Sequence, residues 1–117
     1  MKLKTIVAVA VLVLPAVGGV VVASPALADC PSNTFCLYSG AGYRGTEARF
    51  APGDSCAGVG GIDNDANAMR NYRDNYIRMW DFPGCVGTLT YTADPLSYDS
   101  DFDNNHFTNK ASSLKRI

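Results

Sequence analysis

The densest cluster of side chains suited to metal binding lies near the C-terminus, where three aspartates alternate with other residues. Asp99, Asp101 and Asp103 copy the spacing of the first ligands of an EF-hand calcium loop, whose carboxylate oxygens suit a hard cation. The match then fails, because Asn104 stands where that loop needs glycine and Lys110 where it needs a bidentate glutamate. We interpret this run as an acidic, solvated loop.

Catalytic chemistry has little support in the sequence. The chain contains one histidine, His106, which lies between Asn105 and Phe107 in what we interpret as a loop. It has no Gly-x-Ser-x-Gly motif and no paired Cys/His arrangement that would activate a nucleophile. We therefore predict that the protein is not an enzyme.

The N-terminal residues 1–28 have the composition of a cleaved export signal. Two lysines precede the apolar run Ile6–Leu14, and Ala26–Ala28 supplies the small-x-small cleavage site. The alternative, a membrane anchor, is disfavoured by Pro15 and by this cleavage site. We expect a secreted mature domain spanning 29–117.

The charge of the mature chain excludes several partner classes. Loss of the two leader lysines lowers the formal charge from −1 to −3. That balance is not basic enough for nucleic acid, and no polybasic or amphipathic segment favours a membrane surface. The length fits one small domain, which we expect to be monomeric.

Four cysteines supply the cross-links that a small exported domain needs: Cys30, Cys36, Cys56 and Cys85. Three pairings are open to them, and the absence of C-x-x-C together with a single histidine disfavours a zinc site. We expect Cys30–Cys36, which closes a short loop around Pro31, and Cys56–Cys85, which links the two halves of the domain.

An internal repeat organises the mature chain. Tyr38–Thr46 and Trp80–Thr88 both contain an aromatic residue, four residues, a second large residue, one residue and then Gly-Thr. A second correspondence relates Asp63–Arg70 to Thr108–Lys115, where Asn, Ala, an apolar residue and a basic residue recur in order. Two copies of one unit of about forty residues follow from this.

Each copy is predicted to form strands and turns. Thr88–Thr92 alternates threonine with Leu89 and Tyr91, as a half-buried strand does, and no long window has a helical period. We expect an all-β domain. The expected strands are Phe35–Ser39, Thr46–Phe50 and Ala68–Arg73 in motif one (35–73), and Tyr76–Trp80, Thr88–Ala93 and Ala111–Ile117 in motif two (76–117).

The glycines of the repeat carry a family resemblance. Gly45 and Gly87 stand where a folded-over hairpin needs a backbone conformation that a side chain disfavours. The pattern resembles the Greek-key motif of the βγ-crystallin superfamily. Tyr38–Gly45 matches it in full, and Trp80–Gly87 departs in that Cys85 replaces the second aromatic residue. The resemblance implies a single domain of two Greek-key motifs in two packed antiparallel sheets.

Calcium-binding members of that superfamily carry N/D-N/D-x-x-S/T-S in each motif. Here Asp63–Ala68 keeps the acidic start without the hydroxyls, whereas Thr108–Ser113 keeps the serines without the acidic start. The resemblance therefore implies at most one calcium site, composed of ligands from both motifs. Calcium is an optional ligand, and no cofactor is required. The alternative is that these side chains cap turns. The candidate ligands are Asp63, Asp65, Asn109 and Ser112.

The segment from Cys30 to Tyr38, its glycine turn and the Asn-Asp motif before Arg70 are also similar to peptidase inhibitor family I36. That family includes an inhibitor of thermolysin-like zinc metalloproteases from actinomycetes, which is thought to present a Cys–Val bond. The resemblance therefore implies a secreted metalloprotease as partner, with Cys85-Val86 as the same dipeptide. The implied inhibitory loop contains Phe82, Gly84, Cys85 and Val86.

In that hypothesis a disulfide through Cys85 holds the loop rigid and tethers the ends of a cut bond. The structural alternative is that Val86 packs in the core and Cys85 serves only as a cross-link. Two other functions stay open, a calcium-binding structural module without inhibitory activity and a secreted protein like the killer-toxin branch of the superfamily.

Overall fold

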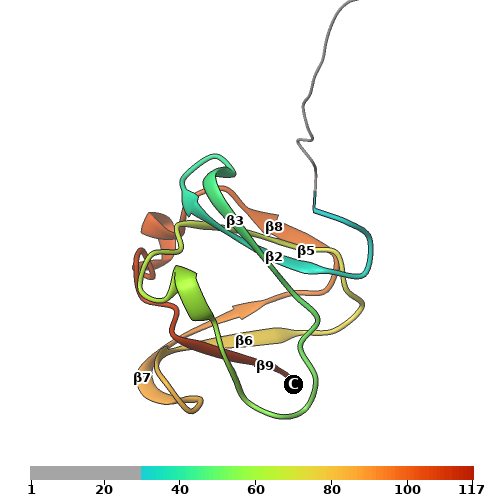
Figure 1. Cartoon of the computed structure of the whole chain (residues 1–117), viewed down its shortest axis with the longest axis vertical. Helices are drawn as coiled ribbons and strands as arrows, with labels where there is room; N and C mark the ends of the chain where they lie inside the picture. Colours follow the sequence, from blue (N-terminus) through green and yellow to red (C-terminus); the bar gives the residue numbers. More distant parts are fainter. Residues whose placement is uncertain (1–29) are drawn as a thin grey trace, which may run out of the picture.

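Two antiparallel sheets pack face to face in the computed structural model, which describes residues 30–117 (Figure 1). The expected export signal lies outside the described residues. The first sheet has the order β3-β2-β5-β8, from β2 (Phe35–Gly40), β3 (Arg44–Phe50), β5 (Ala68–Asn71) and β8 (Ser97–Asp99). The second has the order β4-β9-β6-β7, from β4 (Ala57–Gly58), β6 (Ile77–Phe82), β7 (Val86–Ala93) and β9 (Ser113–Arg116).

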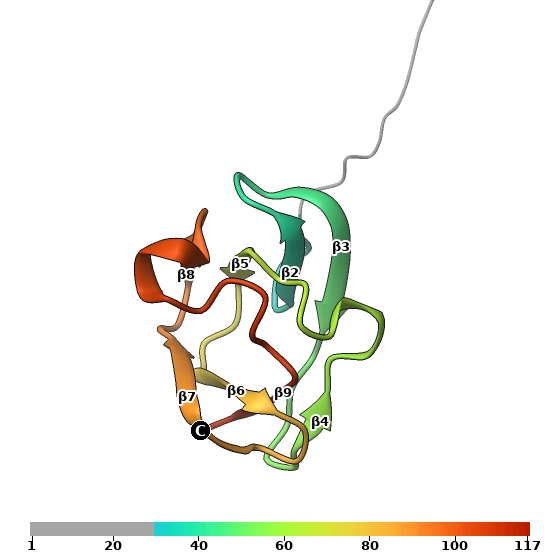
Figure 2. The same ribbon diagram turned by 90° about the vertical axis from the view of Figure 1, so that its left-hand side faces the viewer.

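The two sequence repeats exchange strands between the sheets. Strand β8 comes from the second repeat but pairs with β5 of the first, and β4 comes from the first repeat but pairs with β9 of the second. Figure 2 shows the two layers from the side. The predicted all-β arrangement of two packed antiparallel sheets is confirmed.

The core lies between the sheets and follows the period of two that strands impose. Phe35 and Leu37 of β2 are fully buried against Ile77 and Met79 of β6 within one apolar cluster. The 3₁₀ helix Phe102–Asn105 adds a buried aromatic ring from outside the sheets. The apolar alternation of the strands therefore brings the two repeats together.

Six strands match the six expected ones within about two residues at their ends. Strands β4 and β8 were not predicted, because segments of two and three residues carry no readable periodicity. A short 3₁₀ helix also forms at Gly60–Ile62. None of the helices within 30–117 has the length and apolar character needed to cross a membrane.

The acidic run near the C-terminus is partly structured. Asp99 is the last residue of β8, and its carboxylate accepts hydrogen bonds from the Tyr91 hydroxyl at 2.7 Å and from the Asp101 N–H at 3.0 Å. The Asp101 carboxylate in turn accepts from the Asp103 N–H at 3.0 Å and caps the 3₁₀ helix. These carboxylates therefore stabilise turns.

Both expected disulfides are confirmed. Cys30–Cys36 spans six residues and is buried, whereas Cys56–Cys85 spans 29 residues and has an exposed partner in Cys56. In the chain-entropy account the longer loop stabilises the fold by roughly 3–4 kcal/mol, which is more than the shorter loop contributes. The second disulfide therefore joins motif one to motif two.

Candidate functional site

The two repeats build equivalent folded corners. Gly45 has a φ of 77° and Gly87 a φ of 129°, which is the region that side chains disfavour. A Cβ on Gly45 would collide with the Ser39 hydroxyl, and one on Gly87 with the Asp81 carboxylate. The expected role of the two glycines in these bends is confirmed.

The corner of motif two is a hairpin that presents a short turn. Phe82 at the end of β6 pairs with Val86 at the start of β7, so three residues close the turn. Gly84 and Cys85 both have positive φ, at 81° and 57°. In motif one the second aromatic, Tyr43, has a φ of 63°, so Cys85 takes over the same backbone conformation.

Ser113 of β9 fixes the base of this turn. Its hydroxyl donates a hydrogen bond to the Phe82 carbonyl at 2.6 Å and accepts one from the Cys85 N–H at 2.9 Å. Ser113 is fully buried, so both bonds are shielded from water. The turn is thus held by the β6–β7 ladder, by the disulfide to Cys56 and by Ser113.

The turn exposes two large apolar side chains next to each other. Phe82 and Val86 are both 57% exposed and lie opposite each other across the hairpin. The interpretation in which Val86 packs in the core is wrong, because its side chain is more than half exposed and lies outside the apolar cluster between the sheets. Adjacent exposed apolar residues on a rigid turn are typical of a contact surface.

The disulfide does not bridge the Cys85–Val86 bond. Both cross-links join cysteines that precede Val86, so neither connects the two sides of a cut at that position. The expectation that the cross-link tethers cut ends is therefore wrong. Rigidity of the turn is what the disulfide supplies.

The candidate calcium ligands come together only in part. The Ser112 hydroxyl donates to the Asp63 carboxylate and lies 3.1 Å from Asn64 Oδ1, which joins the two half-motifs across the repeats. Within residues 30–117, the side chains of Asp65 and Asn109 are exposed and make no hydrogen bond to this group. Asn109 contributes instead through its N–H, which donates to the Ala66 carbonyl at 3.0 Å.

Three side-chain oxygens are fewer than the six to eight that calcium takes, so these residues do not fit a tight site. In the described part of the chain, no group of three or more His, Cys, Asp or Glu side chains is placed to hold a metal ion. The reciprocal pair consists of Asn67, fifth in the first half-motif, and Thr108, first in the second. Asn67 Oδ1 and Thr108 Oγ1 are buried without a hydrogen-bond partner within 30–117.

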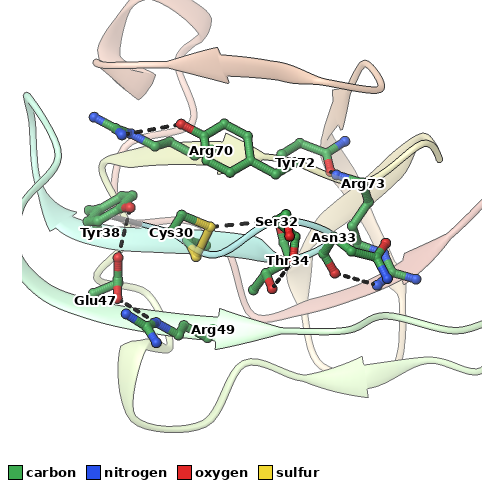
Figure 3. Close-up of a disulfide and its surroundings, with 12 residues drawn as sticks. Cys30, Ser32, Asn33, Thr34, Tyr38, Glu47, Arg49, Arg70, Tyr72 and Arg73 are labelled. Carbon is green, nitrogen blue, oxygen red and sulfur yellow. Dashed lines mark hydrogen bonds and ion pairs between the residues drawn. A yellow bond between two sulfur atoms is a disulfide. The ribbon is translucent and has the colours of Figure 1, made fainter. Parts of the chain in front are cut away.

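The outer face of the first sheet carries a second polar and aromatic cluster (Figure 3). The Tyr38 hydroxyl donates to the Glu47 carboxylate at 2.9 Å beside the buried Cys30–Cys36 bridge. The Arg70 guanidinium lies 4.0 Å from the centroid of the Tyr43 ring and donates to the Tyr72 hydroxyl at 3.3 Å. These hydrogen bonds and the cation–π contact pack the outer face of the first sheet.

The architecture defines a βγ-crystallin-like domain. Solved relatives include a structure described under the evolution of the eye lens βγ-crystallin domain fold, at 11% identity, 78% coverage of this chain, 92% of the other and a TM-score of 0.66. A βγ-crystallin from an archaeon gives 13% identity, 74% and 100% coverage and a TM-score of 0.62. One from Ciona intestinalis gives 14% identity, 72% and 99% coverage and a TM-score of 0.59. At these identities the likeness concerns the fold.

A family comparison is more specific. The sequence model of peptidase inhibitor family I36 matches residues 23–92, and the chain belongs to this family. The match includes both folded corners and the turn between β6 and β7. Comparison with curated proteins finds no match.

Proposed function

We propose that the protein inhibits a peptidase by inserting the turn between β6 and β7 into the enzyme's cleft. The observation that carries this proposal is the exposed pair Phe82 and Val86 on a turn held by a disulfide and by Ser113. Membership of an inhibitor family supports the same role.

Rigidity gives the turn its advantage over an ordinary peptide substrate. A segment already fixed in the free protein loses little conformational entropy when it binds. Val86 would enter the apolar pocket that follows the scissile position, and the carbonyl of Cys85 would face the enzyme's catalytic group. Gly84, with its φ of 81° and open surroundings, lets the backbone approach the enzyme closely.

We further propose a secreted zinc metalloprotease of the thermolysin type as the target. Enzymes of that type favour an apolar residue after the scissile bond, which Val86 provides. A peptide carbonyl can approach such an enzyme's metal without any metal ligand from the inhibitor. Two disulfides and the composition of the leader support secretion.

A calcium-tuned module is the second candidate. It is favoured by one observation, the buried Asn67 Oδ1 and Thr108 Oγ1, which have no hydrogen-bond partner within 30–117 and stand at the reciprocal positions of the Asp63–Ser112 pair. A cation bound there would raise the melting temperature in proportion to the logarithm of its concentration above the dissociation constant. Calorimetry with calcium, with Thr108→Val as the matched variant, tests this candidate.

Titration of the oxidised protein into a thermolysin-type protease tests the inhibitor proposal. Stoichiometric loss of activity supports it, and any slow cleavage should fall between Cys85 and Val86. Full activity at a large excess of the protein would exclude this enzyme type as the target. Rapid digestion of the protein would show that the turn is not rigid enough.

A further inference from the structure

Strand β7 forms an open edge of the second sheet. It is the outermost strand in the order β4-β9-β6-β7, and within residues 30–117 its ladder partner is β6 alone. With eight residues, Val86–Ala93, it is also the longest strand of the described domain. In an antiparallel edge strand every second residue directs its N–H and C=O groups away from the sheet.

Most sheet edges in this protein are protected, and β7 is not. Strand β4 has two residues and β8 has three, which leaves little edge to pair. Strand β3, the counterpart of β7 in the repeat, carries the charged residues Arg44, Glu47 and Arg49. Strand β7 has the sequence VGTLTYTA, with neither a charged residue nor a proline. Charges and prolines are the usual means by which proteins prevent strand addition at an edge.

The side chains of β7 also suit pairing. Leu89 and Tyr91 pack against the core and fix the strand, whereas Thr88 and Thr90 are exposed and uncharged. Threonine is well suited to a strand that is half in contact with a partner. The edge is therefore preformed, held in place by the core and without charged side chains of its own.

The edge begins at the residue proposed to enter the protease. Val86 is the first residue of β7, so the strand continues without interruption from the turn that carries the exposed apolar pair (Figure 2). Any protein that receives the Val86 side chain meets the outer edge of residues 87–92 next.

We propose that the free edge of β7 pairs with an extended main-chain segment lining the cleft of the target protease. Strand addition of this kind supplies main-chain hydrogen bonds, and alternate side chains supply specificity. The inference rests on the inhibitor function proposed above and assigns it a second contact surface. The turn would then insert its apolar side chains into the cleft, and β7 would form main-chain hydrogen bonds with the segment that lines it.

Amide exchange measured by NMR tests the proposal on the oxidised protein, alone and with a slight excess of a thermolysin-type protease, alongside residual activity. In the free protein the outward amides of residues 88–92 should exchange rapidly. On inhibition they should slow at least roughly tenfold, the equivalent of about 1.4 kcal/mol. The amides of β3, at the opposite sheet, should not change.

The possible results separate the two proposals. Inhibition with protection confined to residues 82–87 overturns the strand pairing and leaves the inhibitor function intact. Absence of inhibition removes the inhibitor function and the pairing with it. Protection of β7 that depends on protein concentration without protease would show that a second copy of the chain occupies the edge, which also overturns the proposal.

Charge placed on the edge provides an independent test. Thr90→Lys and Thr90→Glu should both weaken inhibition by roughly tenfold, because either sign would be desolvated against the partner strand. Thr46→Lys and Thr46→Glu place the same charges on exposed β3 and should leave inhibition unchanged. Thermal unfolding of all four variants checks that they fold. Unchanged inhibition by both Thr90 variants would overturn the pairing.

Discussion

The buried hydroxyl of Ser113 donates a hydrogen bond of 2.6 Å to the carbonyl oxygen of Phe82, 31 positions earlier in the chain. The same hydroxyl accepts from the Cys85 N–H. One side chain of β9 therefore closes both sides of the turn that we assign to the protease contact. Its removal should affect the turn more than the rest of the fold.

Ser113→Ala should destabilise the protein and make the turn a better substrate. Two backbone groups would lose their partner, at a cost of roughly 1–3 kcal/mol for a buried unsatisfied group. We expect a lower free energy of unfolding in urea and faster cleavage at Cys85–Val86. Ser97→Ala, which removes a hydroxyl bonded to the Asp94 carbonyl, is the control and should cleave like the original protein.

Val86→Asp should abolish inhibition while leaving the fold intact. The side chain is 57% exposed, so the charge is tolerated in the free protein but not in an apolar pocket. We expect the inhibition constant to rise by roughly thirtyfold or more, as for a contact worth about 2 kcal/mol. Leu96→Asp changes a 65% exposed leucine elsewhere and should inhibit normally. Equal inhibition by both variants would remove Val86 from the site.

Gly45→Ala should lower stability by about 2–4 kcal/mol, because it combines strain at positive φ with a collision against Ser39. Gly53→Ala is the matched control, since Gly53 has no neighbour within 4 Å and no positive φ. Urea unfolding monitored by the fluorescence of Trp80 measures both. A Gly45→Ala variant as stable as Gly53→Ala would show that the corner relaxes.

High pH should destabilise the domain through two tyrosines. Burial and the bond to Glu47 raise the pKa of Tyr38, and burial and the bond to Asp99 raise the pKa of Tyr91. The folded state therefore keeps protons that the unfolded state releases near about pH 10. Stability is retained below that pH and falls above it. The free energy of unfolding in urea, measured between neutral pH and about pH 11, should fall less in Tyr38→Phe and in Tyr91→Phe than in the original protein.

The internal repeat and the turn-forming residues between its strands made most of the fold predictable from the sequence. Gly45 and Gly87 mark bends that few other residues tolerate, and the alternation in Thr88–Thr92 correctly predicted that Leu89 and Tyr91 form the inner side of a half-buried strand. The short strands β4 and β8 could not be predicted, because their pairing depends on tertiary position.

The site was predicted less completely than the fold. The exposure of Val86 could not be predicted, because it lies at the end of a hairpin whose register shifts between Trp80 and Phe82, and such a shift leaves no periodic signal in the sequence. The role of Ser113 depends on contacts that span 28 and 31 positions. The half-motifs placed Asp63 and Ser112 together as candidate calcium ligands and the structure brings them into contact, whereas Asp65 and Asn109 are exposed and make no hydrogen bond to them within 30–117.

Because the repeats exchange strands, a molecule cut between Cys85 and Val86 would consist of two pieces that both contribute strands to each sheet. A cut at Cys85–Val86 releases a C-terminal piece that begins with β7 and carries no cysteine, yet this piece supplies β8 to one sheet and β9 to the other. Each piece then completes a sheet that the other cannot complete alone. The nicked molecule can therefore keep its shape, and denaturant alone should separate its two pieces.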